Sequence, residues 1–425
     1  MKHINRLTKI VILIILINIL LAFSFVSNAS SEITTYSPHV LLLEASTGKI
    51  IYEKGANDRV YPASTTKIMT AILALENCQL TDVVTASYDA IYSVPVGYAH
   101  AYIKVDEELT INQLLHVLLI PSANDAANIL AEHIAGSITS FASMMNTRAV
   151  ELGCTDTNFV NPSGIHDTNH YSSAHDLAII GRYAMQNETF RKIVSTTEYT
   201  LPNTNKYEGV DRYFKTTNSL IAVDTKDRVD NYYYSYATGI KTGYTVAAGN
   251  CVVSSAKKDS VEYIVVILGA ETTDNGLSAR YLDCKKLFEY AFENYSLFEI
   301  YKKDDILKQI EVSTGTFMSA NLNLVIENDI TIIANKDTKT SNLIPEVNIT
   351  SDLALPIVKN SVIGTITYNV DGNEYSSVLL AGNDIIESNL ISYILVIGSV
   401  IIVLFLMMKL VKYNKKKKRK KRRQY

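Results

Sequence analysis

Apolar residues recur at helical spacing through much of the first half of the chain. In residues 68–75 they lie three and four positions apart, which predicts a buried helix. A polar cap and a following proline bound a second apolar helix at 111–120. Further helices are predicted at 126–135, 137–152, 173–184 and 279–295. The Asn-, Thr-, Gly- and Pro-rich residues 153–172 are expected to form a loop.

Short strand-like runs lie before and after this helical block. They cover residues 39–45, 49–54, 199–201, 236–241, 250–256 and 263–269. Strands on both sides of a block of helices predict a single sheet with helices packed on its faces. We therefore expect an α+β domain at residues 30–299.

Alternating apolar and polar positions dominate the next part of the chain. They occur at 322–326, 331–334, 362–368 and 374–380, and Asp371-Gly372 is a hairpin signal between the last two runs. These runs predict a small all-β sandwich domain at residues 300–386.

Residues 390–408 carry no charge, and nineteen helical residues span about 28 Å, close to the thickness of a membrane hydrocarbon core. Eleven Lys and Arg residues and no acid lie between Lys409 and Arg423, and such a cluster marks the cytoplasmic side. We predict a transmembrane anchor at 387–411 and a basic cytoplasmic tail at 412–425. Nucleic-acid binding by the tail is disfavoured.

The N-terminus has the pattern of a secretory signal. Three basic residues precede the apolar stretch 10–26, and small residues follow as far as Ala29. We predict a signal peptide at 1–29, with an uncleaved second anchor as the alternative. Either arrangement places residues 30–388 outside the cytoplasmic membrane.

Length and composition fit an exported protein of two domains. The chain has 425 residues and a net charge of −3, but the basic residues gather at its two ends, so the part between them is acidic. The four cysteines lie far apart in sequence, in neither a metal-site spacing nor a dense disulfide framework. We expect buried free thiols, with a disulfide bridge as the alternative.

Ser64 and Lys67 provide the first candidate chemistry. They lie about one helical turn apart at the start of the 68–75 helix, so the hydroxyl and the amine can meet on one face. A serine hydroxyl becomes a nucleophile when a neighbour takes its proton, and a lysine can do so when its pKa is lowered by desolvation or a second cation.

Two later motifs distinguish Ser64 from the other Ser-x-x-Lys copies at 46–49, 254–257 and 255–258, which are interpreted as structural. Ser-Ala-Asn at 122–124 offers a hydroxyl and a carboxamide at a helix junction. Lys-Thr-Gly at 241–243 follows a strand-like run, where Gly243 would let a substrate backbone approach closely. Lys241 would add a fixed positive charge, suited to a substrate carboxylate and to lowering the pKa of Lys67.

The order Ser-x-x-Lys, Ser-x-Asn, Lys-Thr-Gly resembles the penicillin-binding-protein and serine β-lactamase superfamily. Within it, the chain is most similar to low-molecular-mass D-alanyl-D-alanine carboxypeptidases. The blocks that carry this similarity are YPASTTKIMTAILALE, LLIPSANDAANILAEHIAG, NPSGIHDTNHYSSAHDLA, GIKTGYTVAAGNCVVSSA and ALPIVKNSVIGTITY. The resemblance implies an antiparallel sheet flanked by helices, followed by a small β domain. It implies stem peptides ending in D-Ala-D-Ala as substrates, covalent binding of β-lactam antibiotics, and no cofactor or metal.

The resemblance also implies the roles of individual residues. Ser64 would become acylated, Lys67 would accept its proton, and Ser122 would relay a proton to the leaving amine. The substrate-binding residues would be Asn124, Lys241, Thr242, Gly243 and Tyr244. Among these, Lys241 and Thr242 would hold the terminal carboxylate, and the backbone N–H groups of Ser64 and Tyr244 would form the oxyanion hole.

Several alternatives remain at this point. Asn124 could cap a helix, and Thr242 could be an ordinary strand residue. A zinc hydrolase could use the cluster His166, Asp167, His170, His175 and Asp176, although the spacing fits no standard ligand pattern. A D,D-endopeptidase or a serine β-lactamase would share the three motifs. A wall-binding protein without activity is the non-enzymatic alternative.

Overall fold

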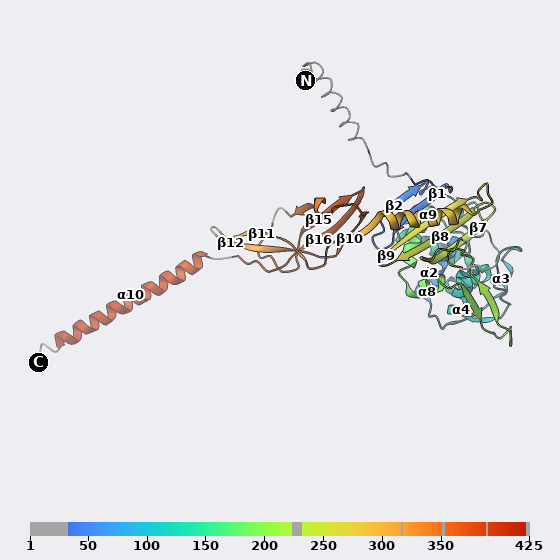
Figure 1. Ribbon diagram of the computed structural model, residues 1–425. Coiled ribbons are helices and arrows are strands. Elements are labelled where there is room, and N and C mark those ends of the chain that lie inside the picture. The colour runs from blue at the N-terminus through green and yellow to red at the C-terminus, as the bar shows by residue number, and fades with distance from the viewer. Residues whose placement is uncertain (1–32, 223–231, 316–317, 351–352, 388–389, 422–425) are drawn as a thin grey trace, which may run out of the picture. The chain divides into compact units, whose positions relative to one another are not determined.

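The computed structural model describes residues 33–222, 232–315, 318–350, 353–387 and 390–421 (Figure 1). The chain divides into two compact units between Glu293 and Asn294. The predicted signal peptide at 1–29 lies outside the described residues.

The first unit is built on an antiparallel sheet of five strands in the order β2-β1-β9-β8-β7. These strands are β1 (His39–Glu44), β2 (Ile50–Lys54), β7 (Ala237–Thr245), β8 (Gly249–Lys258) and β9 (Val261–Ala270). β1 pairs with β9, so strands from the two ends of the unit join in one sheet, as predicted. Two small ribbons pair β3 (Val83–Thr85) with β4 (Glu108–Thr110), and β5 (Glu198–Leu201) with β6 (Arg212–Lys215). The prediction that the 199–201 run joins the single sheet was therefore wrong, because β5 pairs with β6 in a separate ribbon.

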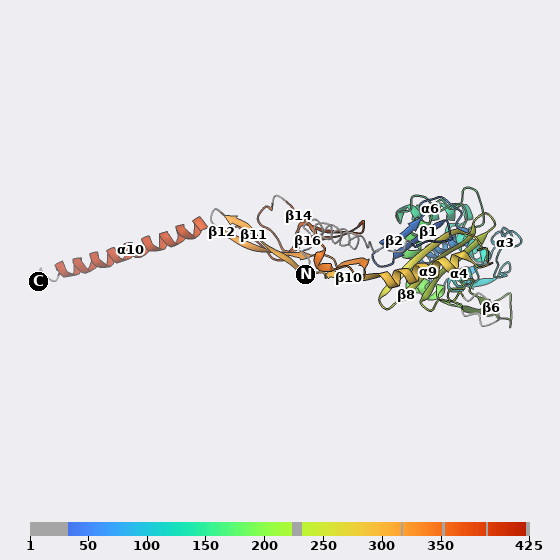
Figure 2. The same ribbon diagram turned by 45° about the horizontal axis from the view of Figure 1, so that its top comes forward.

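Helices cover both faces of this sheet. They are α2 (Lys67–Asn77), α3 (Tyr88–Tyr92), α4 (Ile111–Leu119), α5 (Asn124–Ala135), α6 (Ile138–Glu151), α7 (Ala174–Ala184), α8 (Glu188–Val194) and α9 (Ala279–Asn294). In Figure 1, α9 lies along one face, and α2, α4 and α8 lie on the other side; Figure 2 shows α9 running across the strands.

Local sequence explains where the main helices begin and end. Thr110 and Gln113 form a reciprocal capping box on α4, and Ser173 caps α7 through the N–H of Asp176. Gly136 ends α5 at a φ of +76°, a conformation that glycine adopts without a steric penalty. One expectation was too simple: α2 begins at Lys67 and not at Ser64, because a 3-10 turn, η1 (Ala63–Thr66), precedes it.

The core of the first unit lies between the sheet and the α2–α4–α5–α7 layer. Alternate residues of β1 and β9 enter it, and α2 and α4 contribute their apolar faces. Its fully buried members include Leu41, Ile68, Met69, Leu114, Leu118, Ile264 and Val266. This packing fixes η1 and the start of α5 against the same support.

The second unit contains two antiparallel sheets, as predicted for a β-sandwich. The larger has the order β11-β12-β16-β15-β14, and the smaller pairs β10 with β13. The strands are β10 (Tyr295–Tyr301), β11 (Ile306–Gly315), β12 (Met318–Ile326), β13 (Ile330–Asn335), β14 (Glu346–Ile349), β15 (Val362–Val370) and β16 (Asn373–Ala381), with a short 3-10 turn η2 (Thr340–Asn342). Tyr375 on β16 donates to the carbonyl of Ile333 on β13 at 3.0 Å and links the two sheets.

The helix α10 (Leu390–Lys421) is the one helix among the described residues that is long and apolar enough to cross a membrane. Its apolar side chains from Tyr393 to Val411 are largely exposed, as expected for a segment with no protein core around it. The helix continues into the basic sequence, so the predicted tail at 412–425 is helical as far as Lys421.

We predict that Gly164→Ala destabilises the first unit severely. Gly164 has a φ of +80°, and an added Cβ would lie 1.8 Å from the carbonyl oxygen of Ala63. We expect the free energy of unfolding to fall by about 3 kcal/mol. Gly136→Ala is the control, because it has the same backbone strain with no atom within 4 Å of the new Cβ and should cost only about 1–2 kcal/mol. Denaturant unfolding measures both, and equal losses would contradict the steric explanation.

Candidate active site

Ser64 and Lys67 lie on the 3-10 turn that leads into α2. A 3-10 helix has three residues per turn, so side chains three positions apart are nearly eclipsed. The Nζ of Lys67 lies 3.0 Å from the Oγ of Ser64. The tighter turn therefore brings the two groups into direct hydrogen-bond contact.

Lys67 is completely buried, and its amine has three polar partners. Besides Ser64, Nζ lies 2.7 Å from Oδ1 of Asn124 and 2.8 Å from the carbonyl oxygen of Ser163. A neutral amine has two N–H donors and one lone pair. It can donate to Asn124 and to Ser163 while its lone pair accepts the proton of the Ser64 hydroxyl.

The electrostatic environment favours that neutral form. Burial, and after it the positive charge of Lys241, lowers the pKa of Lys67 well below its usual value, although Asp125 acts in the opposite direction. Lys67 is thus poised to accept a proton.

The junction between α4 and α5 supplies Ser122 and Asn124. Ser122 has a φ of +69° and is nearly buried in the wall of a cavity that also contains Ser64. Asn124 is the first residue of α5, and its side chain makes no capping hydrogen bond. Instead, its Nδ2 donates to the carbonyl oxygen of Ala99 at 2.9 Å while its Oδ1 accepts from Lys67. The carboxamide is held at both ends, so its direct role is to orient Lys67.

The Lys-Thr-Gly motif lies on β7, the strand at the edge of the sheet. Lys241 is buried and donates to the carbonyl oxygen of Thr242 at 2.9 Å. The Oγ1 of Thr242 lies 2.6 Å from the Oγ1 of Thr217. At Gly243 an added Cβ would lie 2.9 Å from the backbone nitrogen of Ser64. Glycine is required there because β7 approaches the nucleophile-bearing turn so closely.

The charge on Lys241 is not fixed, contrary to expectation. Burial, and then the nearby Arg280, lowers the pKa of Lys241 to about 7. Arg280, on the first turn of α9, also lines the cavity and donates from Nη1 to the carbonyls of Gly243 at 3.1 Å and Cys251 at 3.2 Å. Arg280 has no local signal in the sequence, because it lies far along the chain from the Lys-Thr-Gly motif.

The cavity around Ser64 has a volume of about 680 Å³. Among the described residues, its lining contains no aspartate or glutamate. The lining residues are Ser64, Val96, Gly97, Tyr98, Ala99, Pro121, Ser122, Asn124, His166, Thr217, Thr242, Gly243, Tyr244, Thr245, Val246, Ala247 and Arg280. With Arg280 in the wall and Lys241 beside it, the site suits an anionic ligand. Thus all eight predicted site residues lie in or beside one cavity, with Tyr244 at 61% exposure on its rim.

The five residues considered as zinc ligands have separate surroundings. His166 lines the cavity and packs edge-on against Tyr61. His170 is buried against the Oγ1 of Thr66, and burial lowers its pKa to about 4. His175 lies on α7, 3.5 Å from Asp176. No group of three or more His, Cys, Asp or Glu side chains among the described residues could hold a metal ion.

A nucleophilic serine paired with a buried lysine, on a helix-flanked antiparallel sheet, defines a serine hydrolase of the Ser-x-x-Lys type. Comparison with known proteins gives a more specific result. Residues 26–272 match the D-alanyl-D-alanine carboxypeptidase family, and residues 295–387 match the penicillin-binding protein 5 C-terminal domain. The chain therefore belongs to the D-alanyl-D-alanine carboxypeptidase family, which confirms the resemblance, the fold class and the predicted type of enzyme.

Individual relatives agree with this assignment. The chain is 31% identical over 372 residues to D-alanyl-D-alanine carboxypeptidase DacF of Bacillus subtilis, covering 86% of this chain and 90% of the relative. Penicillin-binding protein 5 from Haemophilus influenzae superposes with a TM-score of 0.70 at 27% identity, covering 84% of this chain and 100% of that structure. The Streptomyces K15 DD-transpeptidase superposes with a TM-score of 0.54 at 33% identity, covering 62% and 99%.

We predict a bell-shaped pH dependence of kcat/KM for a peptide with a free terminal carboxylate. On the acid side the rate rises as Lys67 loses its proton. Above a pH of about 7 the rate falls, because Lys241 loses the charge that attracts the carboxylate. Lys241→Arg keeps a positive charge at every accessible pH, so its alkaline limb should move upward by more than about one pH unit. An unchanged alkaline limb would assign that limb to another group.

Proposed function

We propose that this protein removes the terminal D-alanine from peptidoglycan stem peptides ending in D-Ala-D-Ala, through an acyl-enzyme on Ser64. Family membership supports the reaction. The observation that carries the residue assignment is the buried amine of Lys67, which lies 3.0 Å from the Ser64 hydroxyl and has a lowered pKa.

Acylation follows from this geometry. The Oγ of Ser64 attacks the carbonyl carbon between the two D-alanines while its proton passes to Lys67. The bond from that carbon to the leaving nitrogen then breaks, and the proton is relayed through Ser122 to the departing amine. In the second step Lys67 takes a proton from a water molecule, and the water oxygen attacks the ester carbon. The bond from that carbon to the Oγ of Ser64 then breaks, and Lys67 returns the proton to Oγ, which releases the shortened peptide and restores the Ser64 hydroxyl.

Binding of the chain end is assigned to the β7 side of the cavity. Lys241, Thr242 and Arg280 offer charge and hydrogen bonds to the terminal carboxylate. The backbone N–H groups of Ser64 and Tyr244 would receive the oxyanion, and the loss of one such donor costs about 3 kcal/mol in another protease. A β-lactam would acylate Ser64 in the same orientation.

The domain assignment is part of the same proposal. Residues 30–299 would be the catalytic domain, 300–386 the β domain, 387–411 the membrane anchor and 412–425 the cytoplasmic tail, after removal of a signal peptide at 1–29. The apolar α10 and its basic end support the anchor and its orientation. The catalytic domain would then face the cell wall.

We predict that penicillin forms a covalent adduct with the purified protein, visible as an increase in intact mass. Ser64→Ala should abolish the adduct and the release of free D-alanine from a pentapeptide. Ser254→Ala, in another Ser-x-x-Lys copy, should retain both. An adduct that persists in Ser64→Ala would overturn the assignment of the nucleophile.

For the orientation, we predict that protease added to intact cells or protoplasts digests the catalytic domain and spares an epitope placed after Tyr425. The positive charges next to α10 favour retention of that end in the cytoplasm. Permeabilised cells are the control, in which the epitope should also be lost. Loss of the epitope from intact cells would reverse the proposed topology.

A further inference from the structure

Residues 99–103, the wall segment, begin at Ala99 in the cavity lining and are held from two opposite sides. From inside, Asn124 binds the carbonyl oxygen of Ala99 through both its backbone N–H and its Nδ2, each at 2.9 Å. The carboxylate of Asp125 accepts the N–H groups of Ala101 and Ile103 at 3.0–3.1 Å. The wall and the start of α5 are therefore one hydrogen-bonded unit.

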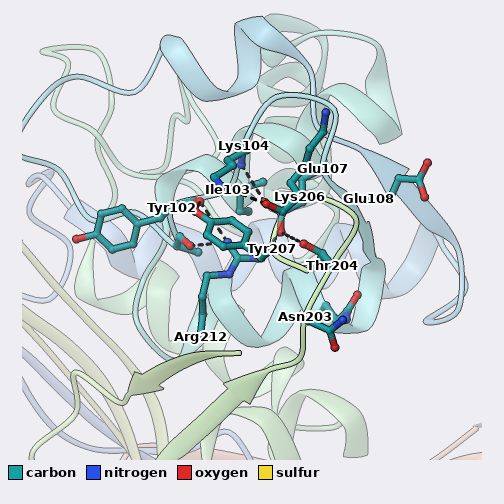
Figure 3. A network of polar contacts seen from close by, with 12 residues as sticks. Tyr102, Ile103, Lys104, Glu107, Glu108, Asn203, Thr204, Lys206, Tyr207 and Arg212 are labelled. Carbon is teal, nitrogen blue, oxygen red and sulfur yellow. Dashed lines mark hydrogen bonds and ion pairs between the residues drawn. The ribbon is translucent and has the colours of Figure 1, made fainter. Parts of the chain in front are cut away.

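From outside, the same segment is held by a group that lies more than a hundred residues later in the sequence. The Nη1 of Arg212 donates to the carbonyl oxygens of Ala101 at 3.0 Å and Tyr102 at 3.2 Å. The hydroxyl of Tyr207 donates to the same carbonyl of Tyr102 at 2.6 Å. Figure 3 shows Arg212 lying along the Tyr207 ring, with its guanidinium 4.1 Å from the ring centroid.

A buried carboxylate fixes Arg212 in this position. Glu107 is fully buried, and it accepts from Arg212, from the hydroxyl of Thr204 at 2.8 Å and from the backbone N–H of Lys104 at 2.9 Å. A buried ion pair with several further hydrogen bonds favours one geometry, because the loss of either partner leaves a buried charge uncompensated. The Nε of Arg212 is buried without a hydrogen-bond partner, so the guanidinium is held through its two Nη groups. We refer to Glu107, Thr204, Tyr207 and Arg212 together as the outer clamp.

The backbone between the two sets of contacts is strained. Tyr102 has a φ of +59°, which is costly for a residue with a bulky side chain, and 72% of its surface is exposed. Such a conformation persists only where the surroundings enforce it. The clamp and Asp125 provide that enforcement. The residues just before this segment, 96–98, line the cavity together with Ala99.

We propose that Arg212 and Glu107 are positioning residues for the reaction at Ser64, because they hold the 99–103 wall in the place where Ala99 orients the Asn124 carboxamide toward Lys67. The connection is continuous: Arg212 binds the Ala101 carbonyl, Ala99 binds Nδ2 of Asn124, and Oδ1 of Asn124 binds Lys67. Release of the wall frees the carboxamide to turn and admits water to the Lys67 amine. This inference rests on the proposed role of Lys67 as the base.

Arg212→Lys tests the clamp with little change in charge. A lysine can still pair with Glu107, but it lacks the planar fork that also reaches two carbonyls. We expect the second-order rate of acylation by penicillin at pH 7 to fall by about tenfold. We also expect the acid limb of the pH–rate profile to move upward, because hydration of Lys67 restores its affinity for a proton. The charged or titratable groups that face Lys67 are Lys241, Asp125 and His170, and the variant changes none of them.

Arg191→Lys is the matched control. Arg191 on α8 binds Glu262 on β9 at 2.8 and 2.9 Å and the carbonyl of Met185 at 2.8 Å, and none of these residues lines the cavity. The two variants should lower the thermal midpoint of unfolding by comparable amounts. For Arg191→Lys, the acylation rate should stay within about twofold of the wild type, and the acid limb of its pH–rate profile should not move within error. Loss of folded protein lowers the amount of adduct formed but does not move the acid limb of the pH–rate profile. A shifted acid limb therefore distinguishes a positioning effect from a loss of stability.

Tyr207→Phe is a milder second variant, to be used together with Arg212→Lys. It keeps the ring and removes one hydrogen bond to the Tyr102 carbonyl, so a threefold to fivefold slower acylation is expected. The clamp proposal is overturned if both variants acylate at the wild-type rate, or if they are slower with an unchanged pH limb. Failure of the proposed function would appear differently, as the absence of a Ser64-dependent adduct in the wild type.

Discussion

The site depends on keeping a lysine amine out of water without a carboxylate partner. An isolated ammonium in a protein interior is costly, and the usual remedy is an ion pair. Here the partners of Lys67 are a carboxamide, a carbonyl and a hydroxyl, and none of them carries a charge that would offset an ammonium. The packing of η1, α5 and the 161–165 loop against one sheet is what makes this environment possible.

A second buried lysine, Lys241, affects the protonation of Lys67, and its own protonation state is affected by burial as well. Lys241 helps to lower the pKa of Lys67, but its own burial beside Arg280 lowers its own pKa to about 7. If Lys241 attracts the terminal carboxylate as proposed, it does so near its own titration point. A bound carboxylate restores the charged form, since an opposite charge nearby favours it.

Much of this could be predicted from sequence, because the main elements have strong periodicity or clear caps. The 68–75, 111–120 and 126–135 helices, a sheet with helices on its faces and the β domain all follow from local pattern, whereas the number of strands in that sheet does not. Short elements such as α3, α8 and β6 were missed because four to seven residues carry too little periodic signal. Strand β10 was also hidden: the helix predicted to 295 ends at Asn294, and the strand starts at Tyr295 without a linker.

The candidate site, like the fold, divides into residues that local sequence predicts and residues that it does not. Three motifs identified Ser64, Lys67 and the β7 residues, because each motif is local in sequence. Ser163, Arg280 and Arg212 were not identified, because their contributions are a backbone carbonyl or a long side chain reaching across the fold. Nothing local in sequence marks a carbonyl that will face an amine 96 residues away. Only the tertiary structure brings these groups together.

The thiol of Cys251 lies directly behind this arrangement. Cys251 pairs with Gly243 across β7 and β8, and its Sγ lies 3.6 Å from the carbonyl of Tyr61, just before the η1 turn. Burial raises its pKa to about 11, so at neutral pH the thiolate fraction is about one in ten thousand. Oxidants and alkylating agents react with the thiolate, and any added atom here would push β7 toward the nucleophile. Because this sulfur is protonated and enclosed, the fold keeps it unreactive toward oxidants at a position directly behind the Lys-Thr-Gly strand.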